Sequence, residues 1–133
     1  MRRLTVFLIF LIAASYAVSG ALAVPTLPPQ STSESGVTVK ATPQNLSDKS
    51  WDFEIAFDTH SQALNDDLMK AAELIADGGA RFQPISWQGD PPGGHHRKGV
   101  LRFKPISPAP QSIELRIMRS DEVQPRSFRW QLK

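Results

Sequence analysis

The three histidines are the residues of this sequence with the widest chemical scope. His60 lies in the short run Asp58-Thr59-His60-Ser61, and His95 and His96 lie in the longer run Gln88-Gly89-Asp90-Pro91-Pro92-Gly93-Gly94-His95-His96-Arg97-Lys98-Gly99. Imidazole and carboxylate groups together suit Cu(II), Zn(II) or Ni(II). A copper or zinc site would therefore draw its ligands from Asp58, His60, His95 and His96.

The same residues also have a structural interpretation. Asp58 and Ser61 are good turn formers, and the run from Asp90 to Gly94 has turn composition. Adjacent histidines in an extended stretch point to opposite faces, and Arg97 repels a cation. Asp58 or Asp90 could instead pair with Arg97 and brace the two loops. A third interpretation is a site for another ligand or partner, with candidate residues Asp58, His60, Asp90, His95, His96 and Arg97.

No catalytic motif accompanies these residues. The sequence has no Gly-x-Ser-x-Gly, phosphate loop, dinucleotide fingerprint or zincin motif. A hydrolase using His60 and Asp90 would need a nucleophile such as Ser61 or Ser86, but almost any chain permits such a set. The absence of Cys excludes a disulfide scaffold, a thiolate zinc site and a cysteine nucleophile. The basic Gly-Gly-His-His-Arg-Lys run lacks the aromatic residues typical of nucleic-acid binding. We therefore expect a non-enzymatic protein.

The first 23 residues predict export. A basic start, an apolar run from Leu4 to Ala17 and Ala21-Leu22-Ala23 form the three regions of a secretory signal peptide, with cleavage after Ala23. The run is too short for a comfortable membrane span, and no second candidate span follows. The general secretion route fits better than the twin-arginine route. We expect a periplasmic or secreted protein, in which residues 24–35, rich in Pro, Ser and Thr, form a disordered linker.

Removal of residues 1–23 changes the charge of the chain. The whole sequence has 15 basic and 13 acidic residues, and losing Arg2 and Arg3 leaves 13 of each. The remaining charge is divided by position. Residues 34–77 hold nine acidic and three basic residues, and residues 78–133 hold four acidic and ten basic ones. This division favours pairing of the two halves across neighbouring strands, with a bipolar binding surface as the alternative.

Alternating apolar and polar residues predict antiparallel strands with one wet face. The clearest alternation runs over 51–57, and others cover 37–41, 101–103, 113–118 and 128–132. Residues 66–76 have helix-forming composition, yet Asp77-Gly78 between two apolar runs is a strong hairpin signal. We favour a strand over 70–76 paired with 80–87, with a helix as the alternative. Pro84 indicates that the second strand is an edge strand or carries a bulge.

Seven short strands separated by Pro and Gly predict an all-β domain over residues 36–133. The pattern is typical of a Greek-key β-sandwich of immunoglobulin or fibronectin type. In that topology the loops after the second, fourth and sixth strands meet at one end. The three histidines would then lie together, with Asp121 and Glu122 beside them.

Three segments of the sequence resemble a family of uncharacterised exported bacterial proteins. They are Trp51-Asp52-Phe53-Glu54 with Asp58-Thr59-His60-Ser61, the run from Trp87 to Leu101 that contains Gly-Asp-Pro-Pro-Gly-Gly-His-His-Arg-Lys-Gly-Val-Leu, and Phe128-Arg129-Trp130. The resemblance implies an exported small β-sandwich and no particular activity. We therefore expect an exported, non-enzymatic protein without a cofactor that binds an unknown protein or small ligand through its loop end. A periplasmic copper- or zinc-binding protein is the alternative.

Overall fold

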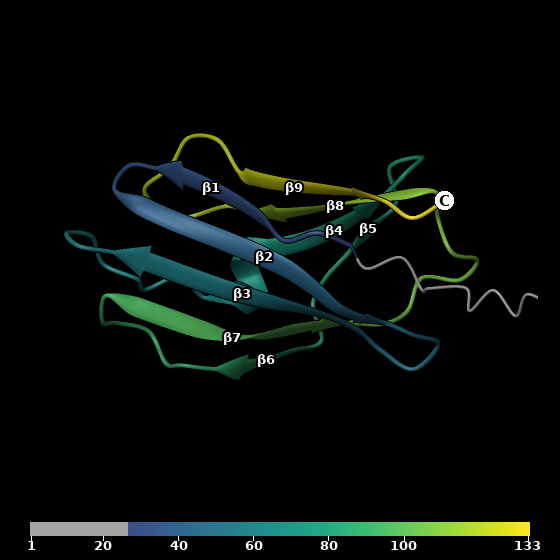
Figure 1. The fold of residues 1–133 in the computed structure, drawn as a ribbon, viewed down its shortest axis with the longest axis horizontal. Helices are drawn as coiled ribbons and strands as arrows, with labels where there is room; N and C mark the ends of the chain where they lie inside the picture. Colours follow the sequence, from purple (N-terminus) through teal and green to yellow (C-terminus); the bar gives the residue numbers. More distant parts are fainter. Residues whose placement is uncertain (1–26) are drawn as a thin grey trace, which may run out of the picture.

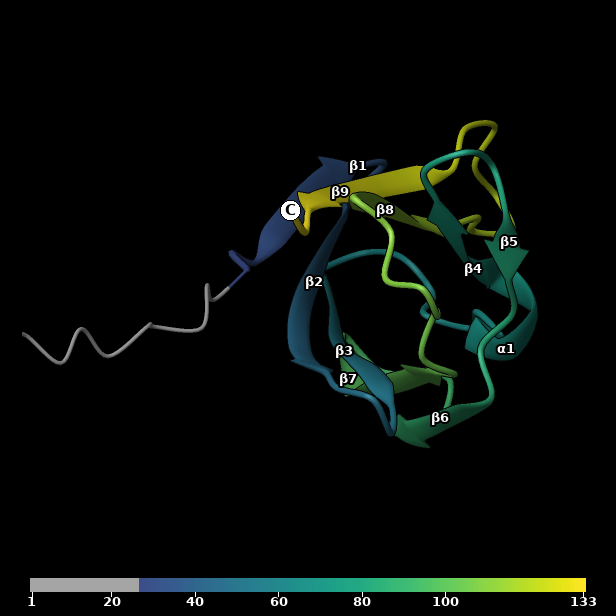
Figure 2. The ribbon, with the colours of Figure 1, turned by 90° about the vertical axis from the view of Figure 1, so that its right-hand side faces the viewer.

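Residues 27–133 form two antiparallel sheets in the computed structural model, which describes only these residues. The first sheet has the strand order β1 (Gln30–Glu34), β2 (Val37–Leu46), β3 (Trp51–Thr59), β7 (His96–Phe103) and β6 (Ser86–Gly89). The second has the order β5 (Arg81–Phe82), β4 (Ala72–Ala76), β8 (Ser112–Ile117) and β9 (Arg126–Gln131). The two sheets curve around a shared interior (Figures 1 and 2). The prediction of an all-β, sandwich-like fold is confirmed at this level.

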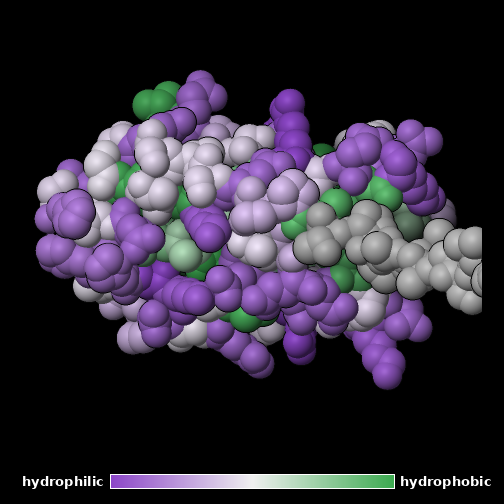
Figure 3. Space-filling view, viewed as in Figure 1, coloured by the Kyte–Doolittle hydropathy of each residue, from purple (hydrophilic) through white to green (hydrophobic). Residues whose placement is uncertain are grey.

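The core follows from the alternation along the strands. Phe53, Ile55 and Phe57 of β3 point inward, and each is at most 1% exposed. Leu74 of β4 and Leu115 of β8 face them from the second sheet and are fully buried. Because neighbouring residues of a strand point to opposite faces, the residues between these apolar positions are left on the outer surfaces. The outer face of the first sheet is accordingly mostly hydrophilic (Figure 3).

The region predicted as a strand or a helix contains both. Residues Leu68–Ala71 form the single helical turn α1, with Asp67 as its N-cap. The chain then becomes β4, which pairs with β5 through Leu74 with Phe82 and Ile75 with Arg81. The predicted hairpin is therefore confirmed, but its first strand begins at Ala72 because the preceding turn is capped and helical.

The predicted strand over 80–87 is divided between the two sheets. Its first part is β5, and its second part, β6, pairs with β7. Pro84 lies buried between them. A proline offers no N–H to a ladder, so the crossing from one sheet to the other falls where a continuous strand could not donate hydrogen bonds.

The expected disordered linker over 24–35 is wrong for its second half. Residues Gln30–Glu34 form β1, which pairs along its whole length with β2. The side-chain amide of Gln30 also bonds both backbone groups of Arg129 on β9, and Trp130 Nε1 donates to the carbonyl of Pro28 at 2.7 Å. These cross-sheet bonds order a segment whose composition alone favours disorder. With β1 and the division of 80–87, residues 27–133 contain nine strands where seven were predicted.

The uneven charge distribution is explained by pairing between strands. Asp52 of β3 receives two hydrogen bonds from Arg102 of β7, at 2.7 and 3.1 Å. Glu54 and Lys98 form a second pair on the same two strands, at 3.4 Å. Asp52 holds the pKa of the Arg102 guanidinium above its usual value, chiefly through the hydrogen bond. The acidic and basic halves of the chain thus meet across the ladder, as predicted.

The signal peptide predicted for residues 1–23 lies outside the described residues. Within residues 27–133, no helix has the length and apolar character needed to cross a membrane.

Candidate functional site

Three loops meet at one end of the molecule, where β3, β6 and β8 end. The loop after β3 contacts the loop after β6 through the Gly93 N–H, which donates to the Leu64 carbonyl at 2.9 Å. It contacts the loop after β8 through Arg119 Nη2, which donates to the Ala63 carbonyl at 3.0 Å. The end of β3 lies directly beside the start of β7, because the Thr59 N–H donates to the His95 carbonyl at 2.9 Å. This arrangement brings the sequence-predicted site residues together.

Five of the predicted residues are exposed and form what we call the loop rim. His96 Nδ1 contacts Asp58 Oδ1 across the β3–β7 ladder, with 76% and 54% of the two side chains exposed. The contact leaves His96 Nε2 facing away from Asp58. The side chains of His60 and His95 make no hydrogen bond within the described part of the chain. The loop rim comprises Asp58, His60, Asp90, His95 and His96.

The buried Thr59 side chain fixes the backbone of the loop that carries His60. Its hydroxyl donates to the Gly36 carbonyl at 2.8 Å. The same oxygen accepts hydrogen bonds from the N–H groups of Ser61 at 3.2 Å and Gln62 at 3.0 Å. The Asp58-Thr59-His60-Ser61 run thus places a buried turn anchor between two exposed polar residues.

Asp90 shapes the second loop with its carboxylate and its backbone. Its Oδ2 accepts from the Lys98 N–H at 3.0 Å, and its own N–H donates to the Lys98 carbonyl at 2.9 Å. Gly93 and Gly94 then turn the chain with φ of 114° and 72°, values that favour glycine. Asp90 therefore closes the loop that carries His95.

Arg97 is a bracing residue and not part of the exposed rim. It is 3% exposed, points inward from β7 and lies over the Trp87 ring at 5.4 Å. Its Nε donates to the Asp90 carbonyl at 3.1 Å, and its Nη1 donates to the Asp66 carbonyl. Burial lowers the pKa of its guanidinium, although Asp66, Asp67 and Asp90 oppose that effect. The brace suggested by the sequence exists, but backbone carbonyls and not a carboxylate accept from Arg97.

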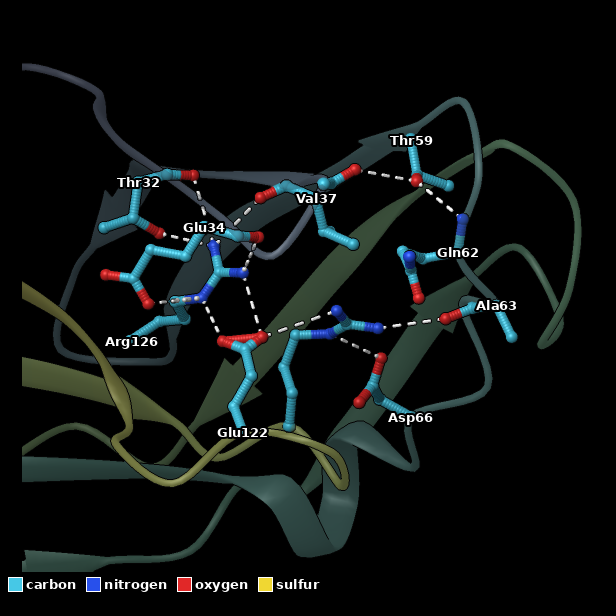
Figure 4. Close-up of polar contacts among 11 residues, drawn as sticks. Thr32, Glu34, Val37, Thr59, Gln62, Ala63, Asp66, Glu122 and Arg126 are labelled. Carbon is cyan, nitrogen blue, oxygen red and sulfur yellow. Dashed lines mark hydrogen bonds and ion pairs between the residues drawn. The ribbon is translucent and has the colours of Figure 1, made fainter.

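A chain of buried ion pairs lies beneath the loop rim (Figure 4). Asp66 Oδ2 accepts from Arg119 Nε at 3.1 Å, and Arg119 Nη1 reaches Glu122 at 3.5 Å. Glu122 also accepts from both Nε and Nη2 of Arg126, whose side chain is fully buried. The hydrogen bond from Arg126 lowers the pKa of Glu122 and outweighs the opposing effect of burial.

Arg126 extends this chain of ion pairs to the first sheet. It donates to the carbonyls of Thr32 at 3.2 Å, Glu34 at 2.9 Å and Val37 at 3.2 Å. One guanidinium thus ties the β1–β2 hairpin to β9. A salt-bridged arginine whose remaining donors are satisfied by carbonyls is strongly held in the interior.

Sequence reasoning placed Glu122 near the site but missed Arg119, Arg126 and Asp66. The signal for the two arginines was the period-two pattern. Arg126 shares the inward phase of Phe128 and Trp130, and Arg119 shares that of Leu115 and Ile117. Two arginines in an inward phase at one end of a sheet predict buried partners, which are acidic residues here.

The predicted metal ligands are not gathered into a metal-binding cluster. Within residues 27–133, no group of three or more His, Asp or Glu side chains is arranged to hold a metal ion.

Comparisons with known proteins add no assignment. No family model matches the sequence, and neither the curated proteins nor the solved structures yield a match. None of these comparisons connects the chain with an enzyme.

Proposed function

We propose that this chain is an exported, non-enzymatic binding protein of immunoglobulin-like topology that contacts its partner through the loop rim. The strand orders β2-β3-β7-β6 and β4-β8-β9 agree with the Greek-key arrangement in which the first, second, fifth and fourth strands share one sheet. The resemblance to exported bacterial proteins and the apolar N-terminal run support export to the periplasm or the medium.

The observation that carries the proposal is that the loop end contains two kinds of polar side chain, buried ones with partners and exposed ones without a partner in the described part of the chain. The charged side chains below the rim are engaged in ion pairs or bonded to carbonyls, whereas His60 and His95 are exposed and have no structural partner among the described residues. Polar loops held on a rigid scaffold are a common way for sandwich domains to bind other molecules. A rim already fixed by buried ion pairs also loses little conformational entropy on binding.

The test compares two double variants of the purified protein immobilised as bait. His60→Ala/His95→Ala removes two rim side chains, and Lys40→Ala/Gln88→Ala removes two exposed side chains from the outer face of the first sheet. We expect the wild type and the sheet variant to retain the same molecules from the exported fraction of the producing cells, and the rim variant to lose them. Equal retention by the rim variant would contradict the proposal.

A Cu(II) or Zn(II) site at the rim is our second candidate function, and the Asp58–His96 contact favours it. A carboxylate bonded to one imidazole nitrogen orients the other nitrogen toward a metal. Titration of the purified protein with each ion should then show binding that His96→Ala abolishes and Asp58→Asn weakens by about 10–100-fold. Binding that survives both substitutions would end this candidate.

A further inference from the structure

An open cavity of about 300 Å³ lies on the second sheet, and none of the five loop-rim residues lines it. It forms where α1 and the start of β4 meet the end of β8 and the loop before β9. Its polar lining residues are Lys70, Glu73, Gln83 and Arg116, and its apolar lining includes Ala71 and Met118. A volume of this size is at the lower end of the range seen for small-molecule sites.

The charges of this cavity favour an anion. Glu73 is engaged by Arg81 at 2.6 Å, so its charge is balanced from outside the cavity. Arg116 donates to Glu114 through Nε alone, at 2.7 Å, and its terminal nitrogens bond no other described residue. Lys70 and Gln83 have no side-chain partner among residues 27–133. Two cations and one amide therefore converge on the cavity with free donors.

Glu114 does not cancel the charge of Arg116. Its carboxylate also accepts from Arg129 Nε at 2.8 Å and from the Ser127 hydroxyl, so one negative charge is shared between two arginines. Burial tends to raise the pKa of Glu114, but these hydrogen bonds and the two arginines lower it overall.

The surroundings of the cavity select the kind of anion. Met118 is 43% exposed at its mouth, and an apolar side chain held at a cavity is a contact surface for an apolar ligand. A neighbouring cavity of about 290 Å³ shares Lys70, Ala71 and Met118 but is also lined by Asp66 and Asp67. Asp66 is already paired with Arg119, whereas the Asp67 carboxylate forms no ion pair with a described residue and would repel a second negative charge on a ligand.

We propose that this cavity is a binding site for a small monocarboxylate with an apolar body. Lys70, Gln83 and Arg116 hold the carboxylate, with the guanidinium of Arg116 offering a planar pair of donors. Ala71 and Met118 contact the apolar part of the ligand. The site is separate from the loop rim, and its existence does not depend on the proposed function of the rim.

The test uses benzoate as the probe and methionine methyl NMR of the purified protein as the readout. We expect benzoate to move the Met118 methyl signal in a saturable way and to leave that of Met69, which lies outside the cavity lining, in place. Neutral benzyl alcohol and dianionic inorganic phosphate should each bind at least about tenfold more weakly than benzoate. Benzyl alcohol lacks the negative charge that the cations bind, and phosphate carries a second negative charge.

Matched variants distinguish benzoate binding in the cavity from general attraction of benzoate to positive charge on the surface. Lys70→Gln and Arg116→Gln should each weaken benzoate binding by about tenfold. Lys104→Gln removes an exposed lysine that does not line the cavity, so it should leave binding unchanged. The proposal is overturned if Met118 shows no saturable response, if Lys104→Gln weakens binding as much as Lys70→Gln, or if phosphate binds as tightly as benzoate.

Discussion

At the scale of single residues, the loop end separates positions that stabilise from positions that are free to bind. Thr59, Arg97 and Arg126 are buried and bonded to backbone carbonyls of other segments. His60 and His95 lie within two residues of such positions and remain exposed. Because the side-chain direction alternates along an extended chain, the adjacent pairs Asp58–Thr59 and His96–Arg97 each supply one exposed and one buried side chain.

Two facing glycines give a first prediction at this scale. A Cβ added to Gly99 would lie 2.6 Å from the Trp87 ring and 2.7 Å from the Cα of Gly89. Gly99→Ala should therefore lower the free energy of unfolding by about 1–3 kcal/mol, because a well-packed site is overfilled. Urea unfolding measures the effect, and Ser86→Ala on the neighbouring strand is the control. Equal stability of Gly99→Ala and the wild type would refute the close packing.

Glu122 gives a prediction about pH. Its pKa is lowered from 4.5 by Arg126, so the carboxylate stabilises the fold above its unfolded pKa, and this stability is lost as the pH falls through the folded pKa. Glu122→Gln should cost about 3 kcal/mol at pH 7, because it removes the nearest carboxylate of the fully buried Arg126 guanidinium. The difference from the wild type should shrink below about pH 4.5.

Unfolding measured across the acidic range tests this sign. Asp121→Asn, an exposed neighbour, should leave stability unchanged at every pH. A Glu122→Gln deficit that stays constant down to pH 3 or grows there would contradict the ion-pair account.

At the scale of elements, Arg97 couples β7 to the loops on either side of it. Arg97→Met should loosen residues 90–95, because it removes the donors to the carbonyls of Asp90 and Asp66. We expect their amide hydrogen exchange to become at least about tenfold faster. Lys98→Met is the matched control, since Lys98 points outward and its pair with Glu54 is exposed. Similar exchange in both variants would show that the brace is dispensable.

The elements also show how far sequence patterns reach. The alternation over 51–57 and 113–118 predicted β3 and β8 because their apolar residues occupy one face. The polar run Gln-Ser-Thr-Ser-Glu offered no such face, and only its pairing with β2 and the bonds from Gln30 to β9 make it β1. The helical composition of 68–71 correctly indicated a helical turn, and the helix stops at Ala71 because the chain pairs with β8 from Ala72 onward.

The candidate site was predictable in position but not in detail. The placement of the three histidines at one end followed from the strand order. The partner of Arg97 could not be read from the sequence, because Asp66 and Asp90 accept through carbonyls that every residue possesses. The cavity at Lys70 and Arg116 joins residues 46 positions apart, from α1 and β8, and no motif marks such a pair.

At the scale of the whole molecule, β1 closes the gap between the two sheets on the β9 side (Figure 2). A chain beginning at Gly36 loses the bonds from Arg126 to Thr32 and Glu34 and the bond from Trp130 to Pro28. We expect its free energy of unfolding to fall by at least about 3 kcal/mol relative to a chain beginning at Leu27. If the two chains melt at the same temperature, β1 does not contribute to the stability of the fold.

We assign partner binding to the exposed loop rim and stabilisation of the fold to the buried residues beneath it. Site-specific photocrosslinking in the producing cells tests this most directly, with the photoreactive residue placed in turn at positions 60 and 95 of the rim and at positions 40 and 88 of the outer sheet face. We expect a discrete crosslinked adduct from the two rim positions and none from the two sheet positions. The same adduct from all four positions, or an adduct from the sheet face alone, would contradict the account.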